Sequence, residues 1–587
     1  MNKLLDLVFS RYGYTEDFLR KIEQSKYVKY LFKDEDKLVL QLKELRRSQD
    51  LVVIMPDFDM DGISAGIIFY AGLSLLGLNV KLYAPDVNRG YGIHVQDIDV
   101  VLSQYPNVKV LLTCDVGITA LDAIAYAKSK DLKVFVTDHH IEGANRSCAD
   151  LIVDPSRNDE VCDFNGVCGA FVAYHVLTIY AELTGNPAVK HLISHLSLFA
   201  CFGSMGDLMP LQYDTRQVVK DGMQEFSNLL MSDTNEYFGC SVNVLPAVYR
   251  NVFLNLRQMH YYLIDHNYIR PQKIDENLYG FTYCPMFNSV KRMGDSIEKL
   301  YHLLYDTFDH QAITTEDSEF ANCVEWLYQL NEQRKVLVDT AFADMLENID
   351  SQPYAPFMFV TDLRPGLLGL LAMKMMSVTG MPTFVVNHVT NGFSGSGRIP
   401  TAFHPAKLLK DEPVYVAGHA YSFGINVPTE SVDDFYASLT NKIKNHLADS
   451  ESSETIQIPV LSVSDAVSKS SCDFILATNN DFDTCMDYAY EIANYGPFGS
   501  GFPEPSLCLY FKRSDVDDIM LMGTAKQHIR YTLANNIRLI WFNGRDFYDK
   551  YFANHQVNDD VFGFVGKFQI NNYFGNVTLQ FLVSDVA

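Results

Sequence analysis

Three aspartates at alternate positions follow an apolar stretch near the start of the chain. Residues 52–56 read Val-Val-Ile-Met-Pro, then come Asp57, Asp59 and Asp61, and Gly62 ends the run. This pattern is typical of a buried strand that delivers carboxylates at its C-terminal end, where open α/β sheets bind ligands. If the strand continues, its two-residue period sends the three side chains to one side. The like charges repel, and a hard divalent cation relieves the repulsion; the alternative is an acidic turn that caps a helix.

Further acidic and imidazole side chains follow three later apolar stretches. These are Asp115 after residues 108–114, Asp138, His139 and His140 after residues 133–137, and Asp207 after residues 198–206. Taken alone, an aspartate after a strand is usually a helix cap, and a histidine pair is an ordinary surface feature. Their recurrence at equivalent strand ends favours one common site.

The candidate ligands are mostly oxygens, with one or two imidazoles. Such a set suits Mn²⁺ or Mg²⁺ better than zinc. The ligands are also too many for one ion that must keep open positions. We therefore predict a two-metal site, with a carboxylate bridging two ions roughly 3.5–4 Å apart.

Strand and helix patterns alternate through the first part of the chain, which predicts a parallel sheet with right-handed crossovers. A long helical pattern spans residues 318 to about 350, and at roughly 1.5 Å per residue it is long enough to join two domains. A second α/β unit follows. After a polar run at 447–454, typical of a linker, short β-type runs begin at 456–463 and predict a small barrel.

Composition narrows the function classes. A chain of 587 residues is too long for one core and predicts two to four domains. The net charge of -25 argues against a surface that coats DNA generally, although a local basic groove remains compatible with it. The 11 cysteines include no Cys-x-x-Cys pair, which predicts reduced thiols in a cytoplasmic protein. No segment approaches the roughly 20 apolar residues of a membrane span.

Four motifs in order resemble those of the DHH phosphoesterase superfamily: Asp-x-Asp-x-Asp-Gly at 57–62, Asp-x-Gly at 115–117, Asp-His-His at 138–140 and Gly-Asp at 206–207. The Gly-Tyr-Gly loop at 90–92 and residues 285–293 narrow the resemblance to the RecJ single-strand exonucleases. Residues 330–335 are similar to the RecJ connecting helix, and residues 495–505 to the loop that enters the RecJ oligonucleotide-binding (OB) fold.

The resemblance implies roles for the residues of the first site. His140 would face the scissile phosphate, Asp138 would orient a histidine, and Asp115 would bridge the metals, so these three are the catalytic candidates. The implied metal ligands are Asp59, Asp61, Asp115, His139 and Asp207, with Asp57 as a further candidate.

A second set of residues resembles the DHH-associated substrate-binding domain. Glycine-rich turns expose backbone N–H groups to anions, and an arginine adds a bidentate phosphate donor. Asn288 and Arg292 also fit the RecJ pattern at 285–293. The implied substrate-binding residues are Arg398, His419, Gly395, Ser396, Gly397, Gly418, Asn288 and Arg292.

The chain departs from the family pattern at several positions. Some relatives have a histidine ligand where this chain has Met55, so we expect the first metal to be held more loosely or to rely on Asp57. Val116 stands where an asparagine is common. Four more residues differ from those common in the family: Met286 replaces an arginine, Lys291 a glycine, Arg364 a histidine and Ala417 a glycine.

The resemblance implies an α/β multidomain chain. A parallel-sheet DHH catalytic domain would span residues 1–315 and a long connecting helix 316–350. A second, smaller α/β substrate-binding domain would span 351–447, and an OB-like β-barrel that binds nucleic acid would span 448–587.

The implied activity is metal-dependent hydrolysis of single-stranded DNA, 5′ to 3′, by a monomeric cytoplasmic exonuclease of DNA repair, recombination or replication. It would use two Mn²⁺ or Mg²⁺ ions, bind no membrane, and have a single-strand-binding protein or a helicase as candidate partners. One alternative is a DHH phosphodiesterase on short RNA or cyclic dinucleotides, whose known forms lack the barrel. The other is a catalytically silent DNA-binding scaffold, like the eukaryotic replication relatives of the superfamily.

Overall fold

The computed structural model separates into two compact units. Unit 1 comprises Met1–Ser25, Pro210–Gln217 and Thr455–Ala587, and unit 2 comprises Lys26–Met209 and Val218–Glu454. The structure describes residues 3–24, 32–162, 164–308, 318–349, 352–400, 402–419, 421–450, 475–477, 482–523, 526–534, 536–542, 544–553, 561–573 and 576–586.

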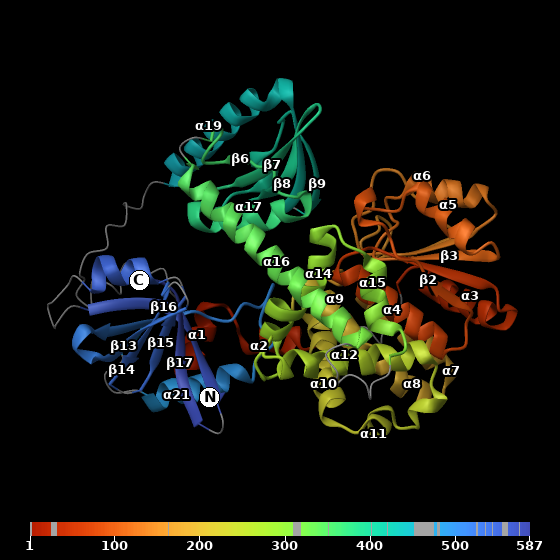
Figure 1. Ribbon diagram of the computed structural model, residues 1–587, viewed down its shortest axis with the longest axis horizontal. Helices are drawn as coiled ribbons and strands as arrows, with labels where there is room; N and C mark the ends of the chain where they lie inside the picture. Colours follow the sequence, from red (N-terminus) through yellow and green to blue (C-terminus); the bar gives the residue numbers. More distant parts are fainter. Residues whose placement is uncertain are drawn as a thin grey trace. The chain divides into compact units, whose positions relative to one another are not determined.

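The first part of unit 2 is built on a five-stranded parallel sheet with strand order β2-β1-β3-β4-β5 (Figure 1). Most residues of these strands are apolar and buried, as expected for a parallel sheet covered on both faces. The predicted parallel sheet is therefore confirmed. Its strands are β1 (Leu51–Pro56), β2 (Val80–Leu82), β3 (Val108–Cys114), β4 (Lys133–Thr137) and β5 (Leu151–Val153).

The aspartates after β1 do not continue the strand, contrary to our expectation. The strand ends at Pro56, and helix α4 (Met60–Leu75) begins four residues later with Asp59 as its N-cap. Asp59 and Asp61 are therefore presented by the first turn of a helix. The pairing with β3 reaches as far as Asp57, whose N–H donates to the Cys114 carbonyl at 3.2 Å before the chain turns into the helix.

Helices cover the sheet and continue beyond it. Those around the sheet are α3 (Glu35–Ser48), α5 (Val95–Gln104), α6 (Leu121–Ser129), α7 (Gly169–Thr184), α8 (Pro187–Ser194) and α9 (Ser197–Gly206). Those that follow are α10 (Tyr213–Met231), α11 (Thr234–Phe238), α12 (Ala247–Asp265), α13 (Glu276–Leu278), α14 (Cys284–Met293) and α15 (Ile297–Tyr305). Helix α4 packs against α7, α9 and α12 and is buried almost all round, which explains its lack of a polar face.

The predicted long helix is α16 (Glu319–Glu347), green in Figure 1. It packs against α14 and α15 and also against α17 (Pro365–Thr379). Met345, near its end, belongs to an apolar cluster with Leu371 of α17 and Val385 of β7 (Thr383–Val389). One continuous helix thus joins the parallel-sheet part of unit 2 to its second α/β part.

The second part of unit 2 is a mixed five-stranded sheet of order β6-β7-β8-β10-β9. Besides β7, its strands are β6 (Met358–Val360), β8 (Gly392–Arg398), β9 (Tyr415–His419) and β10 (Ser422–Pro428), and its helices besides α17 are α18 (Pro405–Leu408) and α19 (Val432–Ser450). The expected linker at 447–454 begins inside α19. Its remaining residues lie outside the described part of the chain.

Unit 1 contains a seven-stranded sheet of order β11-β12-β16-β17-β15-β14-β13. The strands are β11 (Ile475–Ala477), β12 (Leu507–Lys512), β13 (Val516–Met522), β14 (His528–Leu533), β15 (Arg538–Trp541), β16 (Val561–Tyr573) and β17 (Asn576–Val586), and its helices include α21 (Phe482–Ala493) and α22 (Arg545–Phe547). These strands match the predicted β-type runs from 507 onward. The run at 456–463 lies outside the described residues.

Two segments that we expected in the catalytic domain pack into unit 1 instead. Leu5, Val8 and Phe9 of α1 (Lys3–Arg11), which is followed by α2 (Glu16–Ile22), are buried in the same core as the C-terminal strands. Arg216 donates hydrogen bonds to the carbonyls of residues 495–497 and pairs with Glu23 at 2.7 Å. The sequence of an amphipathic helix reveals which of its faces is apolar, but it does not reveal which core that face packs against. No helix among the described residues is long and apolar enough to cross a membrane.

Candidate metal centre

The turn from β1 into α4 fixes two carboxylates by backbone hydrogen bonds. Asp59 caps the helix, and its Oδ1 accepts from the N–H groups of Asp61 at 3.1 Å and Gly62 at 3.2 Å. Asp61 in turn accepts at Oδ2 from the N–H of Gly169 at 2.6 Å and at Oδ1 from that of Ala170 at 2.9 Å. These two N–H groups open helix α7, so a helix N-terminus stabilises the Asp61 charge.

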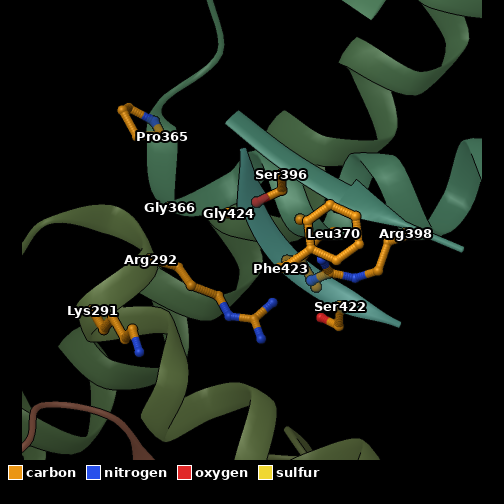
Figure 2. Close-up of a pocket in the computed structure, with 11 residues that line it drawn as sticks. Lys291, Arg292, Pro365, Gly366, Leu370, Ser396, Arg398, Ser422, Phe423 and Gly424 are labelled. Carbon is orange, nitrogen blue, oxygen red and sulfur yellow. The ribbon is translucent and has the colours of Figure 1, made fainter. Parts of the chain in front are cut away.

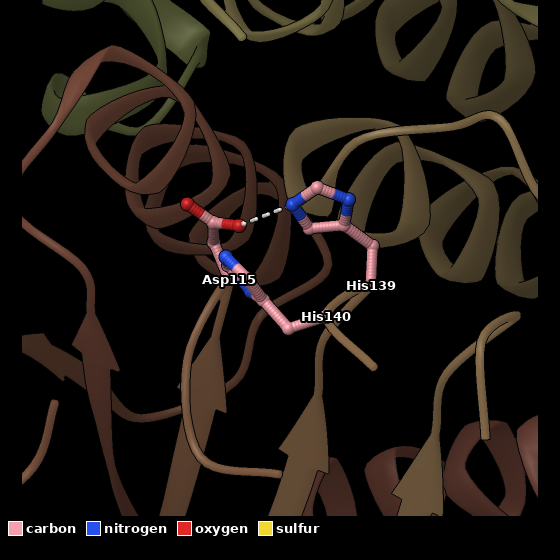
Figure 3. Close-up of side chains that lie close together, drawn as sticks. All are labelled: Asp115, His139 and His140. Carbon is pink, nitrogen blue, oxygen red and sulfur yellow. Dashed lines mark ion pairs between the residues drawn. The ribbon is translucent and has the colours of Figure 1, made fainter. Parts of the chain in front are cut away.

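Four side chains from separate elements converge on one point. His139 Nε2 lies 3.3 Å from Asp115 Oδ1, 3.6 Å from Asp207 Oδ2 and 3.7 Å from Asp61 Oδ2. Figure 3 shows the Asp115 carboxylate directed at the His139 ring from the neighbouring strand end. Asp115 adopts a left-handed backbone with φ of 60°, a conformation that aspartate tolerates better than most residues. Two strand ends, the first turn of α4 and the C-terminus of α9 thus assemble a compact set of three carboxylates and an imidazole.

Two carboxylate oxygens in this set are buried without a hydrogen bond. Within the described part of the chain, no group donates to Asp115 Oδ1 or Asp207 Oδ2 with hydrogen-bond geometry. An acceptor left in this state costs free energy unless a cation satisfies it. Three carboxylates and one imidazole match the ligands of Mn²⁺ or Mg²⁺, so the residues present fit a divalent ion.

Glycines make room for these carboxylates. A Cβ on Gly203 of α9 would lie 2.2 Å from Asp61 Oδ1, and one on Gly169 would lie 2.5 Å from the Cβ of Asp115. Both distances are far below van der Waals contact, so any larger residue would displace a candidate ligand.

Asp57, Asp59 and Asp115 form a second group, with ligand atoms within 4.8 Å of one another. Burial, and then the Asp59 charge, raise the pKa of Asp57 to about 7. Burial and the neighbouring carboxylates also hold the pKa of Asp115 well above its ordinary value, and they raise that of Asp207 to about 8. Without a cation these carboxyls retain protons, and a divalent ion would release them.

Lys291 of α14 supplies a positive charge beside the second group. Its Nζ lies 3.2 Å from Asp59 Oδ2 and 4.9 Å from the centre of the Phe58 ring. Burial would raise the pKa of Asp59, but the ammonium outweighs it and holds the pKa below its ordinary value.

His140 is held by Asp138 rather than by the carboxylates that surround His139. Its Nδ1 lies 2.8 Å from Asp138 Oδ1, and its Nε2 lies 3.2 Å from the Tyr91 hydroxyl. Asp138 also accepts from the backbone N–H groups of Ile118, His139 and His140. Burial lowers the pKa of His140, but the Asp138 carboxylate more than offsets this and raises it to about 9. His140 is therefore an imidazolium at neutral pH.

A basic pocket of about 360 Å³ lies next to the metal centre, between α14, α17 and the strands β8 and β10 (Figure 2). Lys291 and Arg292 of α14 line it, as do Ser396 and Arg398 of β8. Among the described residues, no group accepts a hydrogen bond from the buried Nε of Arg398. Burial and the charges of Arg334 and Arg398 lower the pKa of Arg292 to about 10. The pocket therefore concentrates cations that repel one another, and an anion would relieve that repulsion.

The predicted substrate-binding residues divide into two groups. Arg292, Ser396 and Arg398 line the pocket, whereas Asn288 accepts a hydrogen bond from the Met60 N–H at 3.0 Å and so supports the start of α4.

The glycines do not form the phosphate-binding turn that we expected, because Gly395 and Gly397 lie within strand β8. A Cβ there would meet Val385 O at 2.0 Å or the Phe423 ring at 2.5 Å. Gly418 and His419 lie in β9, paired with β10, and the side chain of His419 is outside the described part of the chain.

Met55, Val116 and Met286 are all buried, and Met55 packs into the apolar cluster behind the sheet. The sequence did not indicate the N–H donors of α7, the contact of Lys291 with Asp59, or that of Tyr91 with His140. The signal available for α7 was a run of small residues at 168–170, but nothing in the sequence pairs that run with Asp61.

Comparisons with known proteins agree with this architecture. Residues 51–203 match the DHH family, N-terminal domain, and residues 482–585 match the RecJ OB domain. The chain is 22% identical over 561 residues to the single-stranded-DNA-specific exonuclease RecJ of Bacillus subtilis, covering 93% of this chain and 62% of that protein. It is 23% identical over 577 residues to the Haemophilus influenzae protein of the same name, covering 92% and 88%.

Among solved structures, RecJ of Thermus thermophilus in complex with Mn²⁺ superposes with a TM-score of 0.69. The match has 19% identity and covers 99% of this chain and 75% of that one. This likeness shows the shared fold. The expected barrel is therefore an OB domain, and the chain spans about three fifths of the length of the Bacillus relative.

Proposed function

We propose that this chain, which matches the DHH family N-terminal domain and the RecJ OB domain and is similar to RecJ proteins along most of its length, is a metal-dependent exonuclease that hydrolyses single-stranded DNA. The observation that carries the proposal is the convergence of Asp61, Asp115, His139 and Asp207, with two buried carboxylate oxygens that accept no hydrogen bond from any described residue. A structural ion-pair network would satisfy those oxygens from within the protein.

The first metal would be held by these four residues, and a second by Asp57, Asp59 and Asp115, with Asp115 contributing to both. When bound, Mn²⁺ or Mg²⁺ lowers the pKa of a coordinated water and neutralises negative charge on the phosphate. The N–H groups of Gly169 and Ala170 fix the Asp61 carboxylate in place for this task.

His140 would act on the phosphate itself. Asp138 keeps it protonated at neutral pH and fixes its ring orientation. An imidazolium beside the metals would donate a hydrogen bond to a non-bridging phosphate oxygen and stabilise the charge that develops in the transition state. Tyr91 would limit the ring's rotation.

The basic pocket would hold a neighbouring phosphate of the same strand. Lys291 lines the pocket and also contacts Asp59, so the phosphate site and the metal centre share this residue. Phosphate contacts of this kind position a strand without reading its bases. The OB domain would bind single-stranded DNA through aromatic stacking and basic side chains.

The relatives named as single-stranded-DNA-specific exonucleases support DNA over short RNA or cyclic dinucleotides, as does the OB domain. The convergence of Asp61, Asp115, His139 and Asp207 argues against a catalytically silent scaffold. Cleavage from 5′ to 3′, a role in repair, recombination or replication, a cytoplasmic monomer, and recruitment by a single-strand-binding protein or a helicase are further parts of the proposal.

A digest of end-labelled oligonucleotides tests the proposal. Single strands labelled at the 5′ or 3′ end, duplex DNA and short RNA are incubated with Mn²⁺, Mg²⁺ or EDTA, beside Asp115→Asn. We expect metal-dependent release of nucleotides from the 5′ end of single strands only. Cleavage that persists in Asp115→Asn would refute the metal assignment. Preference for short RNA would favour the alternative substrate.

A further inference from the structure

The two halves of the metal centre differ in what already occupies their carboxylates. In the half formed by Asp61, Asp115, His139 and Asp207, the described residues leave Asp115 Oδ1 and Asp207 Oδ2 without a hydrogen bond. In the other half, Asp59 uses Oδ1 to cap α4 and faces Lys291 Nζ with Oδ2, at 3.2 Å. One half is open to a cation, and the other already holds an ammonium.

The position of Lys291 is fixed from several directions. Its ammonium stacks over the Phe58 ring at 4.9 Å as well as facing Asp59. Its helix, α14, is attached to the start of α4 by the hydrogen bond from the Met60 N–H to Asn288, at 3.0 Å. The same helix packs along α16. Lys291 is therefore a constrained cation, unlike a mobile surface lysine.

Besides Asp59, this half of the metal centre offers few ligands for a divalent ion. Met55, next to the last residue of β1, packs into the apolar cluster behind the sheet. A thioether is also a poor ligand for Mn²⁺ or Mg²⁺. Asp57 and Asp115 are thus the carboxylates that would hold an ion here without displacing another group.

We propose that Lys291 competes with the second metal ion for Asp59, so that the two ions bind in order: one in the open half first, and one in the Asp59 half only after the ammonium leaves. This inference rests on the proposed metal centre and concerns its occupancy. An ammonium displaced from Asp59 still lines the basic pocket, where it would meet a substrate phosphate. Binding of the second ion would then favour binding of a phosphate in the pocket, and a phosphate in the pocket would favour binding of the second ion to the same extent.

The test counts Mn²⁺ ions on the full-length protein, by electron paramagnetic resonance of free and bound Mn²⁺ and by calorimetric titration. Lys291→Met removes the charge and keeps the bulk of the side chain. Lys291→Arg keeps the charge. Lys299→Met is the matched control, because this lysine stacks on Trp326 at 4.3 Å in the same part of the molecule. Melting curves without metal verify that each variant folds.

We expect the wild type to bind one Mn²⁺ tightly and a second more weakly. Lys291→Met should tighten the second site about tenfold, as expected for loss of a competing ion pair and of one repelling charge. The spectrum of a coupled ion pair should then appear at lower Mn²⁺ concentrations, while Lys291→Arg and Lys299→Met retain the wild-type curve. Superimposable curves for wild type and Lys291→Met would overturn the inference and leave the metal centre intact. A wild type that binds no Mn²⁺ would overturn both.

Discussion

Replacing Arg398 with methionine should affect stability and DNA binding in opposite directions. Arg398 donates to the Gly397 carbonyl at 2.7 Å, but its Nε is buried and meets no acceptor among the described residues. Its charge also helps to lower the pKa of Arg292. Burial without a charge partner is unfavourable, so Arg398 destabilises the fold where it lies. Methionine removes the charge and keeps most of the apolar stem.

The expected magnitudes follow from the contact that Arg398 would make. Loss of one charged phosphate contact, at about 1–2 kcal/mol, weakens binding roughly 5- to 30-fold. For single strands, it also reduces the slope of log K against log salt by about 0.7. The melting temperature without DNA should stay the same or rise, because the repulsion within the pocket is relieved.

Fluorescence anisotropy with a labelled single strand, across a series of KCl concentrations, measures both quantities. An Asp115→Asn background prevents cleavage during the titration. Lys374→Met is the control: Lys374 is an exposed lysine of α17 that pairs with Asp339, and its loss should leave the slope unchanged. An unaltered slope in Arg398→Met would refute the phosphate role. A fall of several degrees in melting temperature would show that Arg398 is needed for folding instead.

Two further substitutions test the metal centre. Asp115→Asn suits the left-handed backbone. It should stabilise the metal-free protein at neutral pH by about 1 kcal/mol, because folding no longer has to protonate a buried carboxyl, and it should abolish the rise in melting temperature caused by Mn²⁺. Scanning fluorimetry with and without Mn²⁺ measures both, and a metal response that persists would contradict the assignment. Gly203→Ala places a methyl group 2.2 Å from Asp61 Oδ1 and should weaken Mn²⁺ binding at least about tenfold by calorimetry. Gly280→Ala is the control, because the added Cβ would meet none of the described neighbouring residues within 4 Å. It should bind Mn²⁺ as the wild type does, and equal affinities in the two alanine variants would contradict the steric argument.

The parallel sheet, and the edge of it that carries the candidate ligands, could be predicted because both depend on local sequence patterns. Apolar runs marked β1, β3 and β4, and parallel strands bring their C-terminal ends to one edge. Asp115 and His139 follow two such ends, so their proximity in the structure follows from topology. The long helix α16 was equally accessible, because an uninterrupted helical pattern needs no tertiary information.

Contacts made across long sequence distances could not be predicted. Asp61 is stabilised by N–H groups of residues 169 and 170, and Lys291 reaches Asp59 across 232 positions. Neither pairing leaves a sequence pattern, because each depends on how two helices meet in three dimensions. The turn after β1 was misjudged for a local reason: Asp59 favours a helix cap, and this preference ended the strand earlier than its alternating pattern suggested.

Unit 1 is assembled from three separate stretches of chain, and this constrains how the protein can be taken apart. Deleting the C-terminal region would expose Leu5, Val8 and Phe9 of α1 and remove the carbonyls that Arg216 binds. A truncated protein would then carry a new apolar patch and a buried arginine left with Glu23 but without its carbonyl acceptors, and aggregation would mimic a loss of DNA binding. The OB domain is therefore not a detachable module. A chimera that replaces it with the OB domain of a RecJ protein would need to replace the first 25 residues and 210–217 together with it.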